Sequence, residues 1–151
     1  MVDKEVIRSL AALFERDLLS LEAEIAAYPE ESALWTTDGT IKNGSGNLAM
    51  HLCGNLQHYV GRVLGGTKYQ RNRDNEFAAR NVPRTDLLTE IKTRREVVAQ
   101  TLNNLNESAL DREYPEHVFD YSMTTVHFLF HLLGHLNYHL GQVNYHRRLL
   151  S

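Results

Sequence analysis

The 151-residue chain contains a single cysteine, Cys53, so no disulfide can form within it. Proteins without disulfides are typical of reducing compartments, and we therefore expect a cytoplasmic protein. The first residues include Asp3, Lys4 and Glu5 rather than an apolar run, so no secretory signal peptide is expected. Three prolines and nine glycines are too few for a collagen-like or low-complexity segment.

The chain also has no large excess of charge of one sign. The formal net charge is −3, from 16 basic and 19 acidic residues, so we expect neither nucleic acid nor a membrane surface as a partner. The length is that of one domain, and hydrophobic residues at 42% are sufficient for a core. We therefore treat residues 1–151 as a single globular domain.

Helical periodicity, by contrast, is abundant. Apolar residues recur every three or four positions in four segments, at about 3–28, 47–63, 85–105 and 122–149. No segment alternates as a half-buried β-strand does. The pattern predicts an all-α protein, a four-helix bundle of the up-and-down type with a long loop between the second and third helices. The polar residues 68–77 in that loop are either a solvated loop with internal ion pairs or a cover for a site or interface.

The first of these helices shows the clearest apolar stripe. Its members are Ile7, Leu10, Phe14, Leu18, Leu21 and Ile25. Most of the charged residues of the same segment lie away from the stripe, which predicts that the stripe faces the core.

Two of the four helices carry no charged residues along most of their length. No Asp, Glu, Lys or Arg occurs in residues 43–61 or in residues 121–146. A helix on the surface needs ionic residues on its wet side, so we expect both helices to be covered on nearly every face. A membrane span is a poor alternative for the last helix, because its histidines and amides would need partners in lipid. We infer instead that part of the cover comes from a subunit interface, in a homodimer.

Histidine is frequent, with eight residues, and most of them lie on these two uncharged helices. On the second helix, one face carries His51, Asn55 and His58. On the last helix, one stripe carries Phe128 together with four polar residues, with His131 at its edge. The four polar residues are His135, His139, Gln142 and His146.

These histidines have the spacing of metal ligands. Two histidines at i and i+4 can reach one ion, and a third from a neighbouring helix completes a three-nitrogen site with an open position. Periodicity alone leaves the pairs 127/131, 131/135 and 135/139 equally open. Taken singly, His58, His127 and His131 are better interpreted as hydrogen-bonded core residues, and Cys53, which faces away from His51, as a small core residue.

Three stretches of the sequence resemble the DinB/YfiT-like superfamily. Residues 131–143 (HLLGHLNYHLGQV) are similar to its last helix, in which a His-x-x-x-His pair is followed by Gly-Gln. Residues 47–56 (NLAMHLCGNL) resemble its second helix, where the first ligand sits in a His-Leu context. Residues 71–77 (RNRDNEF) resemble a loop of an uncharacterised branch.

The resemblance implies a four-helix bundle, usually a homodimer, that binds one divalent metal ion through His51, His135 and His139. Zinc, nickel or iron is the expected ion. Characterised relatives include thiol-dependent S-transferases and isomerases that use bacillithiol, mycothiol or glutathione. We therefore expect a metal-dependent, S-transferase-like enzyme that joins a low-molecular-weight thiol to a small-molecule substrate. The alternatives are a non-catalytic metal-binding stress protein and a helical interaction module without metal.

Further polar residues on the two helices are candidates for supporting roles. Asn55 and Gln142 are candidates for orienting a ligand or substrate through hydrogen bonds. His131 and His58 are candidates for a fourth metal ligand. His146 lies roughly 10 Å along the helix from the last of the three ligands, which is too far for the same ion. It is instead a candidate for a substrate cavity.

Overall fold

The computed structural model describes residues 2–151, in which all regular structure is helical. The elements are α1 (Val2–Ala26), the 3-10 helix η1 (Glu31–Trp35), α2 (Ser45–Leu56), the π-helical η2 (Gln57–Arg62), α3 (Arg73–Ala78), α4 (Arg84–Asn103), the 3-10 helix η3 (Glu107–Ala109) and α5 (Thr125–Leu149). The all-α prediction is confirmed, and the four expected helices are present with their ends shifted by a few residues. None of the helices in residues 2–151 combines the length and the apolarity that a membrane span needs.

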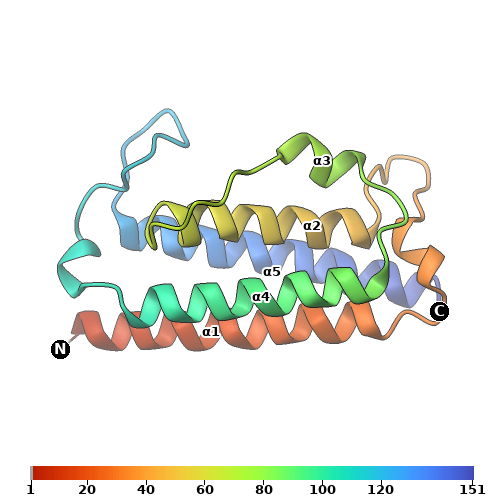
Figure 1. Ribbon diagram of the computed structural model, residues 1–151, viewed down its shortest axis with the longest axis horizontal. Helices are drawn as coiled ribbons and strands as arrows, with labels where there is room; N and C mark the ends of the chain where they lie inside the picture. Colours follow the sequence, from red (N-terminus) through yellow and green to blue (C-terminus); the bar gives the residue numbers. More distant parts are fainter. Residues whose placement is uncertain (1) are drawn as a thin grey trace.

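The four long helices lie side by side along the molecule (Figure 1). α1 and α2 each pack against both α4 and α5. Figure 1 shows α1 and α5 running in one direction and α2 and α4 in the opposite direction. The chain therefore does not follow the simple up-and-down alternation predicted from the sequence. The reason is that residues 63–83 return along the length of α2 before α4 begins, so these two consecutive long helices are parallel.

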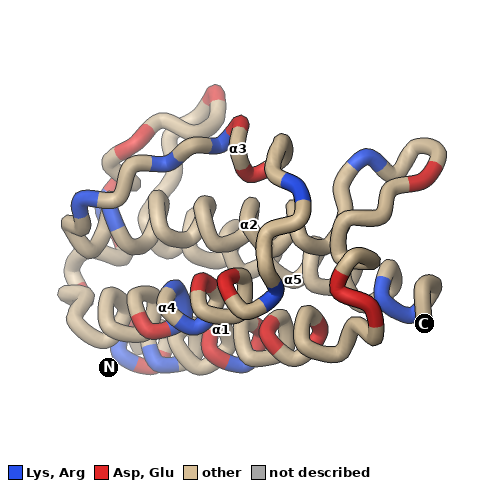
Figure 2. The backbone as a smooth tube through the Cα atoms, turned by 45° about the vertical axis from the view of Figure 1, so that its right-hand side comes forward, with Lys and Arg blue, Asp and Glu red and all other residues tan. Residues whose placement is uncertain are grey.

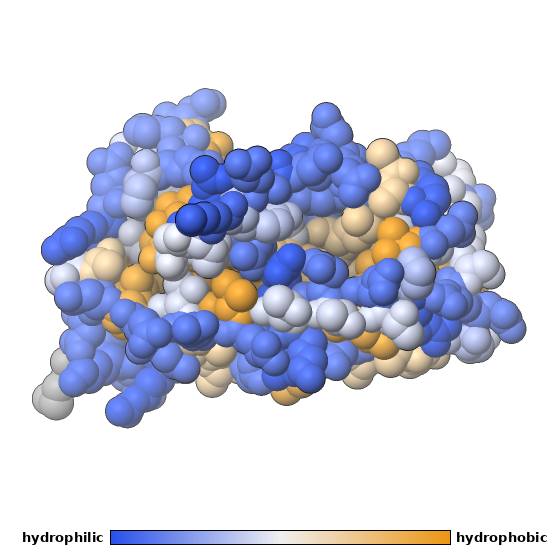
Figure 3. Space-filling model, viewed as in Figure 1, coloured by the Kyte–Doolittle hydropathy of each residue, from blue (hydrophilic) through white to orange (hydrophobic). Residues whose placement is uncertain are grey.

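The predicted stripe of α1 forms one wall of the core. All six of its residues are buried, and they pack with Ile91, Val98 and Leu102 of α4. Charged residues are concentrated on α1, α4 and the connections, whereas α2 and most of α5 carry none (Figure 2). On the face shown in Figure 3, hydrophilic residues surround smaller apolar patches. α1 and α4 are thus ordinary amphipathic helices with a hydrated outer face.

The two uncharged helices differ in how far the chain covers them. Every residue of α2 except Met50 is buried, as predicted. α5 departs from the prediction within one chain, because a row of uncharged residues on it is exposed. We call this row the α5 stripe, and it consists of Phe130, Gly134, Tyr138, Gly141 and Tyr145.

The connection between α2 and α4 is more ordered than a solvated loop, because it contains the short helix α3. Asn72 caps the start of α3 by accepting a hydrogen bond from a backbone N–H at 3.1 Å. The buried Asn47 of α2 donates through Nδ2 to three carbonyl oxygens near the end of α3, those of residues 76, 77 and 79. α3 is thereby held against α2 (Figure 1).

Candidate metal centre

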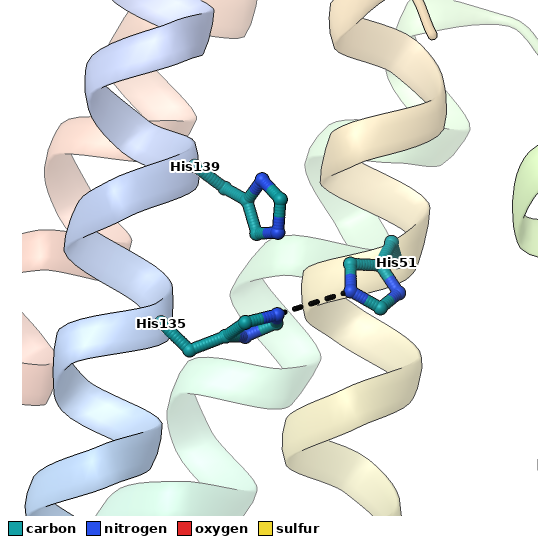
Figure 4. A group of neighbouring side chains, drawn as sticks. All are labelled: His51, His135 and His139. Atoms are coloured by element: carbon teal, nitrogen blue, oxygen red, sulfur yellow. Dashed lines mark hydrogen bonds between the residues drawn. The ribbon is translucent and has the colours of Figure 1, made fainter.

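Three histidines from two helices meet between α2 and α5. His51 projects from α2, and His135 and His139 lie one turn apart on α5 (Figure 4). One ring nitrogen of each lies within 4.8 Å of the other two. Of the i, i+4 pairs that periodicity leaves open, 135/139 is the one that joins His51 in this group.

The spacing of the ring nitrogens suits one shared ion. Zinc–imidazole bonds of ~2.0–2.1 Å in tetrahedral geometry place two ligand nitrogens ~3.3 Å apart. His51 Nε2 and His135 Nε2 are 3.1 Å apart, which is close to that separation. Imidazole nitrogens favour zinc, nickel or iron over magnesium and calcium, which prefer oxygen ligands. The three side chains therefore could hold a divalent transition-metal ion.

Burial keeps the two α5 histidines of the group neutral. Desolvation, reinforced by the nearby His139 and His51, lowers the pKa of His135 to about 4. Desolvation also lowers the pKa of His139, and a hydrogen bond with Gln142 opposes this effect. A metal ligand must be an unprotonated imidazole, so both residues are in the state required for coordination at neutral pH.

Hydrogen bonds orient two of the three rings. The Nδ1–H of His51 donates to a carboxylate oxygen of Glu76 at 3.0 Å, and the Nδ1–H of His139 donates to Gln142 Oε1 at 2.7 Å. Each bond leaves the Nε2 of its ring unprotonated and available as a ligand. The Nδ1 of His135 is buried and has no hydrogen-bond partner among residues 2–151.

Glu76 is itself held by an ion pair. Arg71 donates to both of its carboxylate oxygens, at 2.9 Å each. The side chains of Arg71 and Glu76 are only 11% and 5% exposed. Burial alone would raise the pKa of Glu76, but the hydrogen bonds from His51 and Arg71 and the charge of Arg71 together lower it. Glu76 is therefore an ionised carboxylate at neutral pH.

A cavity of about 720 Å³ opens beside His139. It lies between the C-terminal half of α5 and residues 40–43, which precede α2. Its wall includes His139 and Gln142 together with the aromatic rings of Tyr138 and Tyr145. A small molecule in this cavity can pack against tyrosine rings while it approaches the histidine group.

Two further predicted residues, His131 and His58, lie outside the group. His131 stacks on Phe128, with ring centroids 5.7 Å apart, and contacts Phe119 edge-on. His58 Nε2 lies 3.0 Å from both carboxylate oxygens of Glu116. Neither histidine is therefore placed to be a fourth ligand of an ion held by the other three.

His146 and Asn55 have other surroundings again. Tyr28 donates a hydrogen bond to Ser45 Oγ at 2.6 Å, and its oxygen lies 2.5 Å from His146 Nδ1. His146 Nε2–H donates to the carbonyl oxygen of Thr36 at 2.9 Å. His146 is separate from the histidine group and lines the cavity, in the place expected from its distance along the helix. Asn55 is buried, and its Oδ1 has no hydrogen-bond partner among residues 2–151. Its role in orienting a ligand stays a prediction.

Sequence reasoning did not identify Glu76 and Arg71 as residues of the site. The available signal was the length of the polar connection, which made a cover over a site one of two interpretations. The other interpretation, a solvated loop with internal ion pairs, is right about the ion pair and wrong about its solvation. Charged residues in polar segments are usually exposed, and local periodicity does not show that α3 turns this pair onto α2.

Comparison with known protein families gives a match over nearly the whole chain. A family model described as "Protein of unknown function (DUF1572)" matches residues 2–151. No match is found among curated proteins. The match covers the whole segment that carries the histidine group, the Glu76–Arg71 pair and the cavity.

Proposed function

The chain belongs to the DUF1572 family, and from this premise we propose that it is a DinB/YfiT-like four-helix bundle that binds one divalent metal ion through His51, His135 and His139. The observation that carries the proposal is the convergence of three ring nitrogens within 4.8 Å. The resemblance names these residues from two motifs that are about 80 residues apart in the sequence. Their meeting in space supports the assignment, and zinc, nickel or iron is the expected ion.

We further propose a thiol-dependent, S-transferase-like reaction at this centre. Three protein ligands leave a coordination position open, which is typical of catalytic rather than structural zinc sites. When bound, the ion would act as a Lewis acid that lowers the pKa of a thiol. The thiol sulfur would form a bond to an electrophilic carbon of the substrate as the bond from that carbon to its leaving group breaks. The thiol proton would depart with the leaving group.

The cavity beside His139 is the proposed binding place for the small-molecule substrate. Gln142 would keep the His139 ring oriented at the cavity wall, because it accepts the Nδ1–H bond. The rings of Tyr138 and Tyr145 offer apolar surface to a substrate. A cytoplasmic location would supply the reduced low-molecular-weight thiol that the reaction consumes.

The α5 stripe supports the proposal of a homodimer. Tyr138 and Tyr145 are 66% and 64% exposed, and they lie in a stretch, residues 121–146, that contains no Asp, Glu, Lys or Arg. The space above Gly134 and Gly141 is open, so a second helix can approach the α5 backbone closely. Charge-poor surfaces that carry tyrosine are typical of protein interfaces.

One observation favours a second candidate, a non-catalytic protein in which the ion stabilises the fold. The ligands come from α2 and α5, so a bound ion would cross-link two helices that are distant in the sequence. Metal binding to a native site adds its free energy to folding. This candidate shares the metal site with the enzyme and differs in having no turnover.

Elemental analysis of untagged wild-type protein beside His135→Ala tests the metal site directly. We expect about one ion per chain in the wild type and a loss of the ion in the variant. Protein that binds no zinc, nickel or iron, even after incubation with each ion, would contradict both candidates.

Assays with glutathione, bacillithiol and mycothiol against chloroaromatic and epoxide acceptors then separate the two candidates. Thiol consumption that His135→Ala lacks supports the enzyme. A metal-loaded protein that turns over no thiol, and whose cobalt-substituted spectrum no thiol perturbs, supports the stabilising role instead.

A further inference from the structure

The ion pair between Arg71 and Glu76 is more deeply buried than the other arginine–carboxylate pairs in residues 2–151. Buried ion pairs are weak sources of stability, because both charges lose their hydration. Glu76 is also the one buried residue of the connection formed by residues 63–83. Its position against His51 therefore suggests a role in the site rather than in the core.

The hydrogen bonds of Glu76 determine the protonation pattern of His51. One carboxylate oxygen accepts the Nδ1–H of His51 at 3.0 Å, while both accept from Arg71. A carboxylate can only accept, so this bond requires the proton on Nδ1. It is shorter than the 3.3 Å between Nδ1 and Arg71 Nη2, a donor that would favour the other tautomer, so the geometry favours the Nδ1–H form. The lone pair of His51 is then on Nε2, the atom that lies 3.1 Å from His135 Nε2.

A glycine on α2, Gly54, leaves room for the carboxylate of Glu76. A Cβ atom on Gly54 would lie 1.9 Å from Glu76 Oε2, so a larger residue on α2 would displace the carboxylate. Asn47, one turn before His51 on the same helix, donates to the carbonyl oxygen of Glu76 at 3.1 Å. α2 thus carries His51 itself, the glycine that makes space for the carboxylate of Glu76, and the asparagine that holds the α3 segment in place.

We propose that Glu76, held by Arg71, is a positioning residue of the metal centre that keeps His51 in the Nδ1–H tautomer with Nε2 directed at the ion. This inference rests on the proposed metal site and assigns a function to the connection that contains α3. Carboxylates that orient ligand histidines in this way typically change metal affinity by about 10- to 100-fold when they are removed.

Cobalt binding to the full chain, followed by visible absorption, tests the proposal. Glu76→Gln keeps the size of the side chain but replaces an acceptor by an amide donor that faces Arg71. Gly54→Ala keeps every ligand and charge, favours the helix, and pushes the carboxylate away. We expect both variants to bind Co²⁺ about 10- to 100-fold more weakly than the wild type.

The chain offers a matched control in Glu116→Gln, which removes a carboxylate from His58, a histidine outside the group. We expect its cobalt affinity to equal that of the wild type. Circular dichroism at the titration temperature shows whether each variant is folded. If Glu76→Gln does not fold, the comparison of Gly54→Ala with the wild type still tests the proposal.

Nitrogen NMR of the imidazole rings gives a readout that does not depend on metal. In the metal-free wild type we expect His51 to be protonated on Nδ1, and in Glu76→Gln we expect a mixture of tautomers. Unchanged cobalt affinity in both variants, with binding abolished in His51→Ala, would overturn the positioning role and leave the metal site intact. Wild-type protein that binds no Co²⁺ would instead overturn the proposed function on which the role rests.

Discussion

Cys53 lies two residues after His51 but points into the core, with only 5% of its surface exposed. Burial raises the pKa of its thiol to about 12. At pH 8, on the order of one thiol in ten thousand would then be ionised in the native protein. We predict that a thiol reagent such as Ellman's reagent labels Cys53 far more slowly in native than in urea-unfolded protein.

The labelling rate also shows whether Cys53 or a small-molecule thiol is the better candidate for the sulfur nucleophile of the proposed reaction. Only the thiolate attacks a disulfide reagent, so a buried and protonated Cys53 cannot serve as a nucleophile. Native labelling as fast as that of the unfolded chain would contradict this prediction and would make Cys53 a candidate participant in the proposed reaction. Slow labelling is the result expected if the thiol comes from a small molecule.

The histidine group shows how far local spacing can reach. Residues at i and i+4 on a helix share a face, so His135 and His139 could be paired from the sequence, although two other pairs had the same spacing. His51 on the second helix was the expected third ligand for one of these pairs, but the choice of the pair 135/139 depended on the resemblance, because periodicity does not say which turn of one helix faces which turn of another. Glu76 was missed for a related reason: its contact with His51 joins residues 25 positions apart and depends on how α3 folds back.

Asn47 connects α2 to α3 and is the natural place to test this contact between elements. Its fully buried amide donates to the carbonyl oxygens of residues 76, 77 and 79. Arg80 also donates to the carbonyl oxygens of residues 77 and 79, but not to that of residue 76. In Asn47→Ala the carbonyl oxygen of Glu76 therefore loses its side-chain donor. We expect the free energy of unfolding to fall by about 1–3 kcal/mol, as measured by urea denaturation.

Asn103→Ala is the matched control, since Asn103 is exposed on α4 and makes no side-chain hydrogen bond among those found in residues 2–151. Its free energy of unfolding should be close to that of the wild type. Equal stability of Asn47→Ala and the wild type would mean that water replaces the amide and that α3 is not anchored by Asn47.

At the level of elements, amphipathic helices were the most predictable part of the fold. α1 has a continuous apolar stripe and a charged outer face, so its buried side could be predicted residue by residue. The direction of α4 could not be predicted in the same way. It depends on the path of residues 63–83, whose polar sequence has no period that distinguishes a short turn from a return along α2.

A metal ion held between α2 and α5 should stabilise the whole molecule. Binding to the native state alone adds about 2.7 kcal/mol when the free ion is at 100 times its Kd. For a chain of this size, that corresponds to a rise in Tm of roughly 5–10 °C. We expect differential scanning calorimetry to show this rise on loading the metal-free protein with zinc. His51→Ala should show no rise, and a similar rise in that variant would place the binding elsewhere.

The α5 stripe allows a test of subunit association that does not disturb the single chain. Gly134 is exposed, and no atom lies within 4 Å of the position that a Cβ on this residue would take, so Gly134→Glu meets no clash in the monomer and improves helix propensity. Between two stripes, the same substitution would bury an unpaired charge and block close approach. We expect light scattering after size exclusion to give about 35 kDa for the wild type, twice the 17.3 kDa of the chain, and the single-chain mass for Gly134→Glu.

Ser9→Glu, the control variant, adds the same charge to the exposed face of α1 and should stay dimeric. A wild-type mass of one chain would contradict the homodimer, and a Gly134→Glu dimer would place its interface away from the α5 stripe.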